Sequence, residues 1–66
     1  MAVTLKAARN NTGLNQDEAA EKLGISSVTL HRYESGKSFP DVPTIKRIET
    51  LYGVPFGEIE FAEREE

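Results

Sequence analysis

The segment between Ser27 and Ser35 carries side chains whose chemistry suits the edges of nucleic-acid bases. Arginine can donate two parallel hydrogen bonds to guanine, serine can bond to several bases, and valine methyl groups can contact the thymine methyl. At about 100° per residue in a helix, one face holds Ser27, Val28, His31, Arg32 and Ser35. Leu30 and Tyr33 fall on the opposite side. This pattern fits a base-reading surface, and it also fits an ordinary solvated helix face.

The same sequence offers little for catalysis or for metal binding. It has one histidine and no cysteine, so a zinc site built from the usual ligands is excluded. Asp17, Asp41 and His31 are present, but no spacing unites a nucleophile, a base and an orienting acid. The glycines have neither a phosphate-cradling nor a dinucleotide-binding spacing. We therefore expect no enzyme, no cofactor and no metal.

The length of 66 residues fits one domain, residues 1–66, with a small core and no disulfide to support it. Stability must come from well-packed helices, with or without the help of a partner subunit. No apolar run reaches the roughly 18 residues that a membrane helix needs, and the first residues do not have the pattern of a secretory signal. We expect a cytoplasmic protein with no membrane partner.

The negative charge is concentrated near the end of the sequence. The net charge is −3, yet residues 1–57 hold seven basic and six acidic side chains, and residues 58–66 hold one basic and five acidic ones. The acidity is therefore a property of the tail, and the near-neutral body can still present a positive face to a partner.

Glycines and polar cap residues divide the chain into short helices. Asn15, Ser26 and Asp41 are suitable N-cap residues, and a glycine follows each of the first four apolar stretches. We predict an all-α, compact five-helix domain without strands, with helices over 3–11, 16–23, 27–35, 42–52 and 56–61. The expected core is Leu5, Ala8, Leu14, Ala19, Ala20, Leu23, Ile25, Leu30, Tyr33, Ile45, Ile48, Leu51, Tyr52, Val54, Phe56 and Ile59.

The connection between the second and third predicted helices is unusually short. Only Gly24, Ile25 and Ser26 separate them, and a turn of this length forces the two helix axes to cross steeply. The spacing therefore predicts a helix-turn-helix unit whose second helix is the segment with the polar face.

In this context the sequence resembles the repressor/Cro-type helix-turn-helix family, also called the xenobiotic-response-element family, which includes phage lambda-type repressors. The resemblance extends from Leu5 to Phe61. The order and spacing of its matching residues make it specific: Leu5, Arg9, Gly13-Leu14-Asn15-Gln16, Glu18-Ala19-Ala20, Leu23-Gly24-Ile25-Ser26, Leu30, Arg32-Tyr33-Glu34, Gly36-Lys37, Pro40, Ile45, Ile48, Gly53-Val54, Glu58 and Ile59. It implies a lambda-repressor-like fold that binds double-stranded DNA to regulate transcription, as a repressor encoded by a bacterium or a phage.

The resemblance also implies a role for individual residues. Ser27, Val28 and Arg32 match base-reading positions of the recognition helix, and phosphate contacts are implied for Gln16, Ser26, Ser35 and Lys37. We expect His31, beside Arg32, to contact a phosphate or to lie in solvent rather than to act as a catalytic base. Arg9 and Glu34 match a salt bridge between the first and third helices. Plain structural alternatives remain for several of these, since Ser26 also suits an N-cap and Gln16 or Arg32 also suit a solvated surface.

The resemblance further implies a homodimer on a near-palindromic operator. Phe56 matches a position near the two-fold axis, and it equally suits a role in closing the monomer core. Three positions depart from the family pattern: Ala19 and Tyr52, where leucine is common, and Glu49, where alanine is common. We expect Glu49 to reach solvent, Arg47, Lys46 or a partner chain.

The alternative function is a protein-interaction module on the same fold, an antitoxin or antirepressor that binds a partner through its acidic tail.

Overall fold

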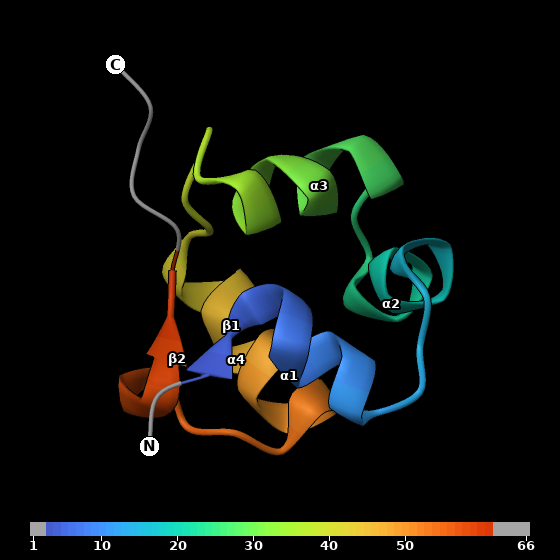
Figure 1. Cartoon of the computed structure of the whole chain (residues 1–66). Helices are drawn as coiled ribbons and strands as arrows, with labels where there is room; N and C mark the ends of the chain where they lie inside the picture. The colour runs from blue at the N-terminus through green and yellow to red at the C-terminus, as the bar shows by residue number, and fades with distance from the viewer. Residues whose placement is uncertain (1–2, 62–66) are drawn as a thin grey trace.

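The computed structural model describes residues 3–61, which form four α-helices, one 3-10 turn and two very short strands (Figure 1). In chain order these are β1 (Val3–Thr4), α1 (Leu5–Asn11), α2 (Gln16–Leu23), α3 (Ser27–Ser35), α4 (Val42–Tyr52), η1 (Phe56–Glu58) and β2 (Ile59–Glu60). The acidic tail from residue 62 onward lies outside the described residues.

Side-chain caps define the ends of the central helices. The Asn15 side chain accepts a hydrogen bond from the Glu18 backbone N–H at 2.8 Å, while the Glu18 carboxylate accepts one from the Asn15 backbone N–H at 3.0 Å. This reciprocal pair satisfies two N–H groups that the first turn of α2 leaves without helical partners. Ser26 and Asp41 cap α3 and α4 in the simpler one-sided way. The predicted helices over 16–23, 27–35 and 42–52 are therefore confirmed.

The turn between α2 and α3 depends on Gly24. Its φ of +74° lies in the left-handed region, where a side chain would be strained and glycine is not. Its backbone N–H donates to the carbonyl oxygens of Ala20 and Glu21, which ends α2. The chain can then begin α3 at Ser27, as the short spacing predicted.

The prediction was wrong at both ends of the fold. The first helix begins at Leu5 rather than at residue 3, because Val3 and Thr4 are extended and the Thr4 side chain caps α1. The expected fifth helix over 56–61 is only the 3-10 turn η1, after which Ile59 pairs in parallel with Val3. A helix of six residues containing Gly57 gains little, whereas pairing with β1 satisfies backbone groups at the edge of the core. The all-α expectation therefore holds for the main body, with four helices and a small two-stranded sheet.

The core draws one large apolar side chain from each helix. Leu5, Leu23, Leu30 and Ile48 are fully buried, and they come from α1, α2, α3 and α4 respectively. The other predicted core residues are buried or half-buried, with one exception. Phe56 is 41% exposed, so the expectation that it lies in the core is wrong, because η1 holds its ring at the surface.

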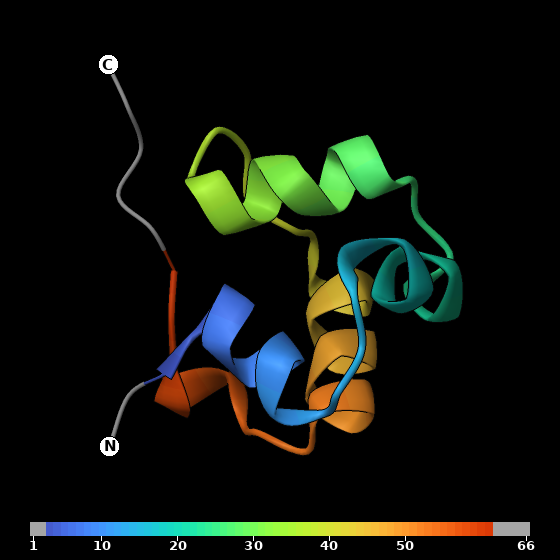
Figure 2. The ribbon, with the colours of Figure 1, turned by 45° about the vertical axis from the view of Figure 1, so that its right-hand side comes forward.

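α3 lies along one side of the molecule. In Figure 1 it runs across the top, with α1 and α4 beneath it and α2 at one end, and the turned view in Figure 2 keeps this arrangement. Only one side of α3 packs against the body, through Leu30, which has no exposed surface, and the half-buried Tyr33. The other side is free to meet a partner.

Candidate nucleic-acid interface

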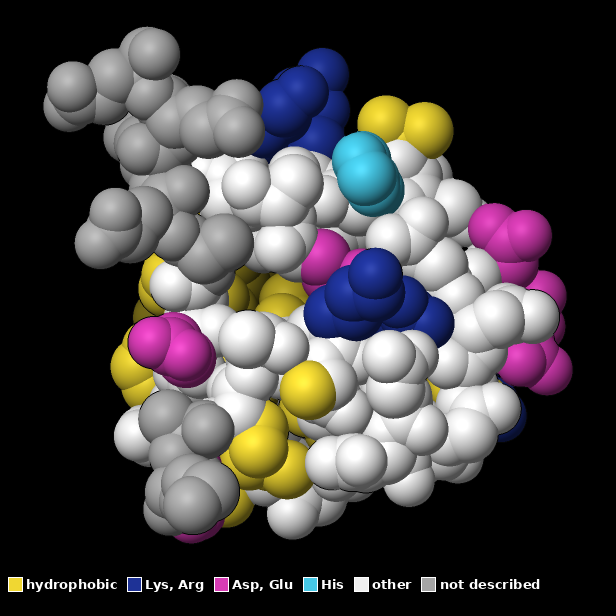
Figure 3. All heavy atoms as spheres, in the orientation of Figure 1, with side chains coloured by type: hydrophobic (Ala, Val, Ile, Leu, Met, Phe, Trp, Pro, Cys, Tyr) yellow, Lys and Arg dark blue, Asp and Glu magenta, His cyan; other side chains and the backbone are white. Residues whose placement is uncertain are grey.

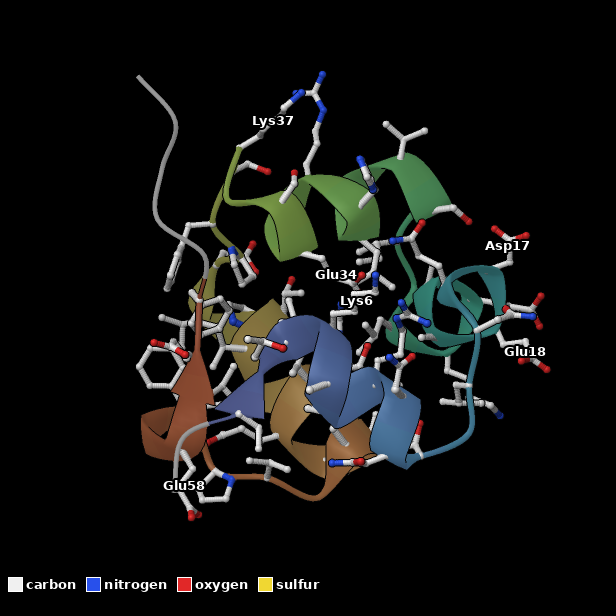
Figure 4. All side chains as sticks on the ribbon, in the orientation of Figure 1. Lys6, Asp17, Glu18, Glu34, Lys37 and Glu58 are labelled. Carbon is white, nitrogen blue, oxygen red and sulfur yellow. The ribbon has the colours of Figure 1, made fainter. Side chains whose placement is uncertain are left out.

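The outer side of α3 is polar, with one exposed apolar residue. Val28 is 66% exposed, His31 and Arg32 are exposed, and Ser27 and Ser35 are half-buried. Lys37 follows α3 and is exposed beside it (Figure 4). Figure 3 shows Lys or Arg side chains, the histidine and an apolar side chain spread over this upper surface. The structure therefore brings the three expected base-reading residues and most of the expected phosphate-contacting residues to one face.

Ser26 performs the structural role that was one of its two expected roles. Its hydroxyl accepts a hydrogen bond from the Thr29 backbone N–H at 3.1 Å and shares another with the Thr29 hydroxyl at 2.8 Å. It is exposed at the N-terminus of α3, where backbone N–H groups and the helix dipole attract anions. The cap fixes the orientation of the first turn of α3.

The ion pair expected between Arg9 and Glu34 is present and anchors α3 to α1. Arg9 Nε donates to Glu34 Oε2 at 2.7 Å and Arg9 Nη2 donates to Glu34 Oε1 at 3.2 Å. The side chains are 8% and 6% exposed. Hydrogen bonding to Glu34 raises the pKa of Arg9 above its usual value, which keeps the guanidinium charged although it is buried. Arg9 Nη1 also donates to the Leu14 carbonyl at 3.1 Å, so the pair also holds the loop before α2.

Gln16 belongs to the same network. Its Nε2 donates to Glu34 Oε1 at 3.1 Å, which links the start of α2 to α3. The amide nitrogen has two N–H groups, and the second is the one able to donate to a phosphate. Gln16 is thus held in place by Glu34 at the edge of the polar face, a contact that sequence reasoning did not predict.

A concave surface of about 510 Å³ adjoins the outer face of α3. Its lining residues are Lys6, Arg9, Gln16, His31, Glu34 and Ser35. Figure 3 shows carboxylate and Lys or Arg side chains meeting in the middle of this face, and Figure 4 places Lys6 with Glu34 between α1 and α3. Arg9 and Gln16 already donate to Glu34. Lys6, His31 and the second N–H of Gln16 add further hydrogen-bond donors to this hollow.

Lys6 was not among the expected site residues. It is exposed, on the first turn of α1, and only the folding of α1 against α3 brings it to the hollow that His31 also lines. The available signal was its spacing from Arg9, three residues along the same helix, which places both side chains on one face. That spacing alone does not distinguish Lys6 from other exposed lysines.

Asp17 is the second residue of the interface that the sequence analysis did not identify. Asp17 lies in the first turn of α2 and its Oδ1 accepts a hydrogen bond from the Ser27 hydroxyl. This contact joins the two helices of the helix-turn-helix at their N-terminal ends. It places a carboxylate beside an expected base-reading residue.

Glu49 has a partner that was not among those expected. Its Oε2 accepts a hydrogen bond from the Phe56 backbone N–H at 2.6 Å, so the side chain caps the beginning of η1. Among the described residues its hydrogen-bond partner is this backbone amide and not a cation such as Lys46 or Arg47. This contact accounts for an acidic residue at a position where the family often has alanine.

Within residues 3–61, no helix is long and apolar enough to cross a membrane. In the same range, no group of three or more histidine, cysteine, aspartate or glutamate side chains is placed to hold a metal ion.

Comparison with known proteins identifies a family and several relatives. A family model described as helix-turn-helix matches residues 5–59. The transcriptional regulator ImmR of Bacillus subtilis is 44% identical over 50 residues, which cover 76% of this chain and 39% of ImmR. The transcriptional repressor RstR of the cryptic phage CTXphi, from Vibrio cholerae, is 33% identical over 55 residues, covering 83% of this chain and 50% of RstR. The transcriptional activator BcrR of Enterococcus faecalis is 31% identical over 55 residues, covering 83% of this chain and 27% of BcrR.

The chain therefore spans between about a quarter and a half of the length of these curated relatives. No solved structure gives a significant match to it.

Proposed function

Because this chain belongs to the helix-turn-helix family, whose relatives are named as transcriptional regulators, we propose that it binds double-stranded DNA and represses transcription. The observation that carries the proposal is the position of α3. One side of this helix is anchored by Leu30, Tyr33 and the Glu34 ion pair, and the other side is polar and exposed. A helix held in this way can enter the major groove, which is wide enough to admit it.

Within the groove, Ser27, Val28 and Arg32 contact base edges. Arg32 is exposed and long enough to donate two hydrogen bonds to guanine O6 and N7. Val28, at 66% exposed, offers its methyl groups to a thymine methyl. Ser27 lies at the start of the helix, where the first turn approaches the bases in helix-turn-helix proteins.

Contacts to the phosphates come from residues around this face. We assign this role to Gln16, Ser26, His31, Ser35 and Lys37, and we add Lys6. The exposure of His31 and Lys37, the free second N–H of the Gln16 amide and the helix start at Ser26 support the assignment. The assignment of Lys6 is supported by its exposure and by its place among the residues that line the hollow, as His31 does. These contacts set the register of the protein on DNA and carry no base preference.

The protein acts as a homodimer on a near-palindromic operator. A dimer doubles the phosphate contacts of a body whose net charge is close to zero, which raises its affinity for DNA. The exposed ring of Phe56, packed in a cluster with Phe39 and Phe61, supports a subunit contact there. Two recognition helices about 34 Å apart would then read two half-sites one DNA turn apart.

Residues 1–66 act as one DNA-binding domain, bacterial or phage-encoded as its relatives are, and work in the cytoplasm where the DNA is. We propose no enzymatic activity. Repression is favoured by the repressor name of RstR, whereas the name of BcrR shows that a related domain can also serve activation.

Selection of bound sequences from a random duplex pool, followed by titration of variants, tests the proposal. The wild-type protein should select two inverted half-sites. Arg32→Ala should weaken operator binding by about 1–3 kcal/mol and relax the preference at one base pair per half-site. Lys37→Ala is the matched control, since it removes one exposed cation that contacts phosphate. It should weaken operator and random duplex alike and lower the salt slope by about 1 per subunit.

Two results would contradict the proposal. A Kd that does not change with salt, together with no selected sequence, would favour the protein-interaction module instead. If Arg32→Ala weakened binding to operator and to random DNA equally, as is expected of Lys37→Ala, the base-reading assignment of Arg32 would be wrong.

A further inference from the structure

The contact between Asp17 and Ser27 has a consequence for which bases the protein accepts. The Ser27 hydroxyl donates its hydrogen bond to Asp17 Oδ1, across the two helices of the helix-turn-helix unit. Asp17 is exposed and Ser27 is half-buried, so both remain accessible at the interface end of α3. Figure 4 shows Asp17 projecting outward from α2 on the side where α3 begins.

This hydrogen bond determines which groups the pair can offer to DNA. A serine hydroxyl has one O–H donor and two acceptor lone pairs, and an ionised carboxylate has acceptors only. Because Ser27 uses its single donor on Asp17, the two side chains together present hydrogen-bond acceptors and no donor. Without Asp17, the Ser27 hydroxyl could turn and donate to any acceptor on a base.

The negative charge of Asp17 is unfavourable for DNA binding. Its contact with Ser27 places it next to the face that we propose approaches phosphates, and the one ion pair among residues 3–61 is that of Arg9 and Glu34. The N-terminus of α2 partly stabilises the negative charge of Asp17, because the helix dipole favours acidic residues in the first turn. Glu18, in the same turn, already provides a carboxylate for this purpose. The helix dipole therefore does not explain why Asp17 accepts a hydrogen bond from Ser27.

We propose that Asp17 is a specificity-determining residue, which leaves the side chains of Ser27 and Asp17 with hydrogen-bond acceptors only and so selects a base with an exocyclic amine. In the major groove, cytosine N4 and adenine N6 are donors, whereas guanine O6 and N7 and thymine O4 are acceptors. The pair therefore accepts a hydrogen bond from cytosine or adenine at one position of each half-site. It rejects guanine and thymine there, because their acceptors would face the carboxylate.

This inference rests on the proposed function, since it requires α3 to lie in the major groove. Its test is the binding of operator variants that carry each of the four base pairs at every half-site position. At one position the wild-type protein should bind the cytosine or adenine version about 10-fold or more tightly than the guanine or thymine version. In Asp17→Asn this ratio should fall to within about 3-fold, because the asparagine amide can donate as well as accept.

Two further variants separate base selection from charge and from stability. Glu18→Gln removes the same charge from the same helical turn and retains an oxygen for the capping contact to Asn15. Both neutralising variants should bind random duplex more tightly, and only Asp17→Asn should change the base preference. Ser27→Ala, which removes the shared hydroxyl, should change the preference at the same position as Asp17→Asn.

The possible failures can be told apart. If Asp17→Asn and Glu18→Gln both keep the base preference of the wild-type protein, this inference is wrong and the proposed function is unaffected. The inference is also wrong if the wild-type protein prefers guanine or thymine at the position that Ser27→Ala affects. A wild-type protein without any base preference would overturn both.

Discussion

Arg9 and Glu34 are 25 residues apart in the sequence, and their side chains form two hydrogen bonds, of 2.7 and 3.2 Å, that connect α1 to α3. Both side chains are more than nine-tenths buried. Glu34 accepts a third hydrogen bond from Gln16 and so connects three helices through one carboxylate. The orientation of the proposed recognition helix therefore depends on a buried ion pair as well as on the burial of Leu30.

Breaking this pair should cost the domain much of its stability. Arg9→Ala or Glu34→Gln leaves one buried charged group without its ionic partner, which costs about 3–5 kcal/mol. This is a large fraction of the roughly 5–15 kcal/mol by which a small domain is stable. Urea unfolding followed by circular dichroism measures the loss.

A paired replacement is the control for that prediction. Arg9→Met combined with Glu34→Leu removes both charges, so neither is left buried and alone, and it should cost less than either single change. A loss of under about 1 kcal/mol in either single variant would show that water reaches the pair and screens it.

The buried phenol of Tyr52 should make the stability of the folded protein depend on pH in the alkaline range. Its hydroxyl is buried and has no hydrogen-bond partner among the described residues. Burial, with a smaller contribution from the charge of Glu34, raises the pKa of Tyr52 to about 12. An unfolded tyrosine titrates near pH 10. The folded state therefore holds the proton more tightly, and this contribution to stability is complete below about pH 10 and is lost as the pH rises toward 12.

Tyr52→Phe isolates this contribution. Near neutral pH the variant should be as stable as the wild-type protein or more stable by up to about 1 kcal/mol, because an unpaired buried hydroxyl is removed. Between pH 10 and 12 the wild-type protein should lose about 2–3 kcal/mol more than the variant. Urea titrations at several pH values measure the difference. Parallel losses in both proteins would mean that the phenol titrates normally.

The helices could be predicted from the sequence because their ends are determined locally. Asn15, Ser26 and Asp41 cap the helices that follow them, and Gly24 ends the helix before it, so each boundary depends on neighbouring residues. The fifth helix could not be rejected in this way. Ile59 becomes a strand because Val3, at the other end of the chain, pairs with it, and no local pattern contains that contact.

In the proposed site, too, features within one helix could be predicted from the sequence, whereas contacts between helices could not. A helical repeat near 100° per residue was enough to place Val28 and Arg32 opposite Leu30. The hydrogen bonds of Asp17 to Ser27 and of Gln16 to Glu34 join different helices. Such contacts depend on the angles at which the helices cross and on the side-chain rotamers. The spacing of residues along the sequence determines neither of these.

Two glycines with different backbone conformations, Gly24 after α2 and Gly57 in η1, should respond differently to replacement by alanine. Gly24 has a φ of +74°, and a Cβ added there would meet nothing within 4 Å, so Gly24→Ala should be destabilised by backbone strain alone. That strain costs about 1–2 kcal/mol. Gly57 also has open space around it and is not among the glycines with positive φ. Gly57→Ala should therefore be neutral or stabilising by a few tenths of a kcal/mol.

Thermal unfolding checks both glycine variants, since about 1 kcal/mol shifts the midpoint by about 4–8 °C in a domain of this size. Equal midpoints for Gly24→Ala and Gly57→Ala would show that the α2–α3 turn relaxes to accept a side chain.

The aromatic cluster of Phe39, Phe56 and Phe61 predicts where two subunits meet. The ring centroids of Phe39 and Phe61 are 4.6 Å apart, and those of Phe56 and Phe61 are 5.5 Å apart. Phe39 is 59% exposed and Phe56 is 41% exposed, so the cluster leaves apolar rings at the surface of the monomer. Burying a phenylalanine side chain contributes about 1.5–3 kcal/mol. In a two-fold dimer, Phe56→Ser should therefore raise the dissociation constant by at least about 10-fold.

Sedimentation velocity over a range of concentrations measures this constant. Phe56→Leu keeps an apolar side chain and is the matched control, so it should stay within a few-fold of the wild-type protein. Urea unfolding of each variant measures monomer stability separately, because the Phe56 ring also packs against Phe39 and Phe61 within the monomer. Phe56→Ser should also weaken operator binding, since a monomer loses the contacts that the second half-site provides. If Phe56→Ser sediments as the wild-type protein does at every concentration, the two subunits do not meet at this cluster.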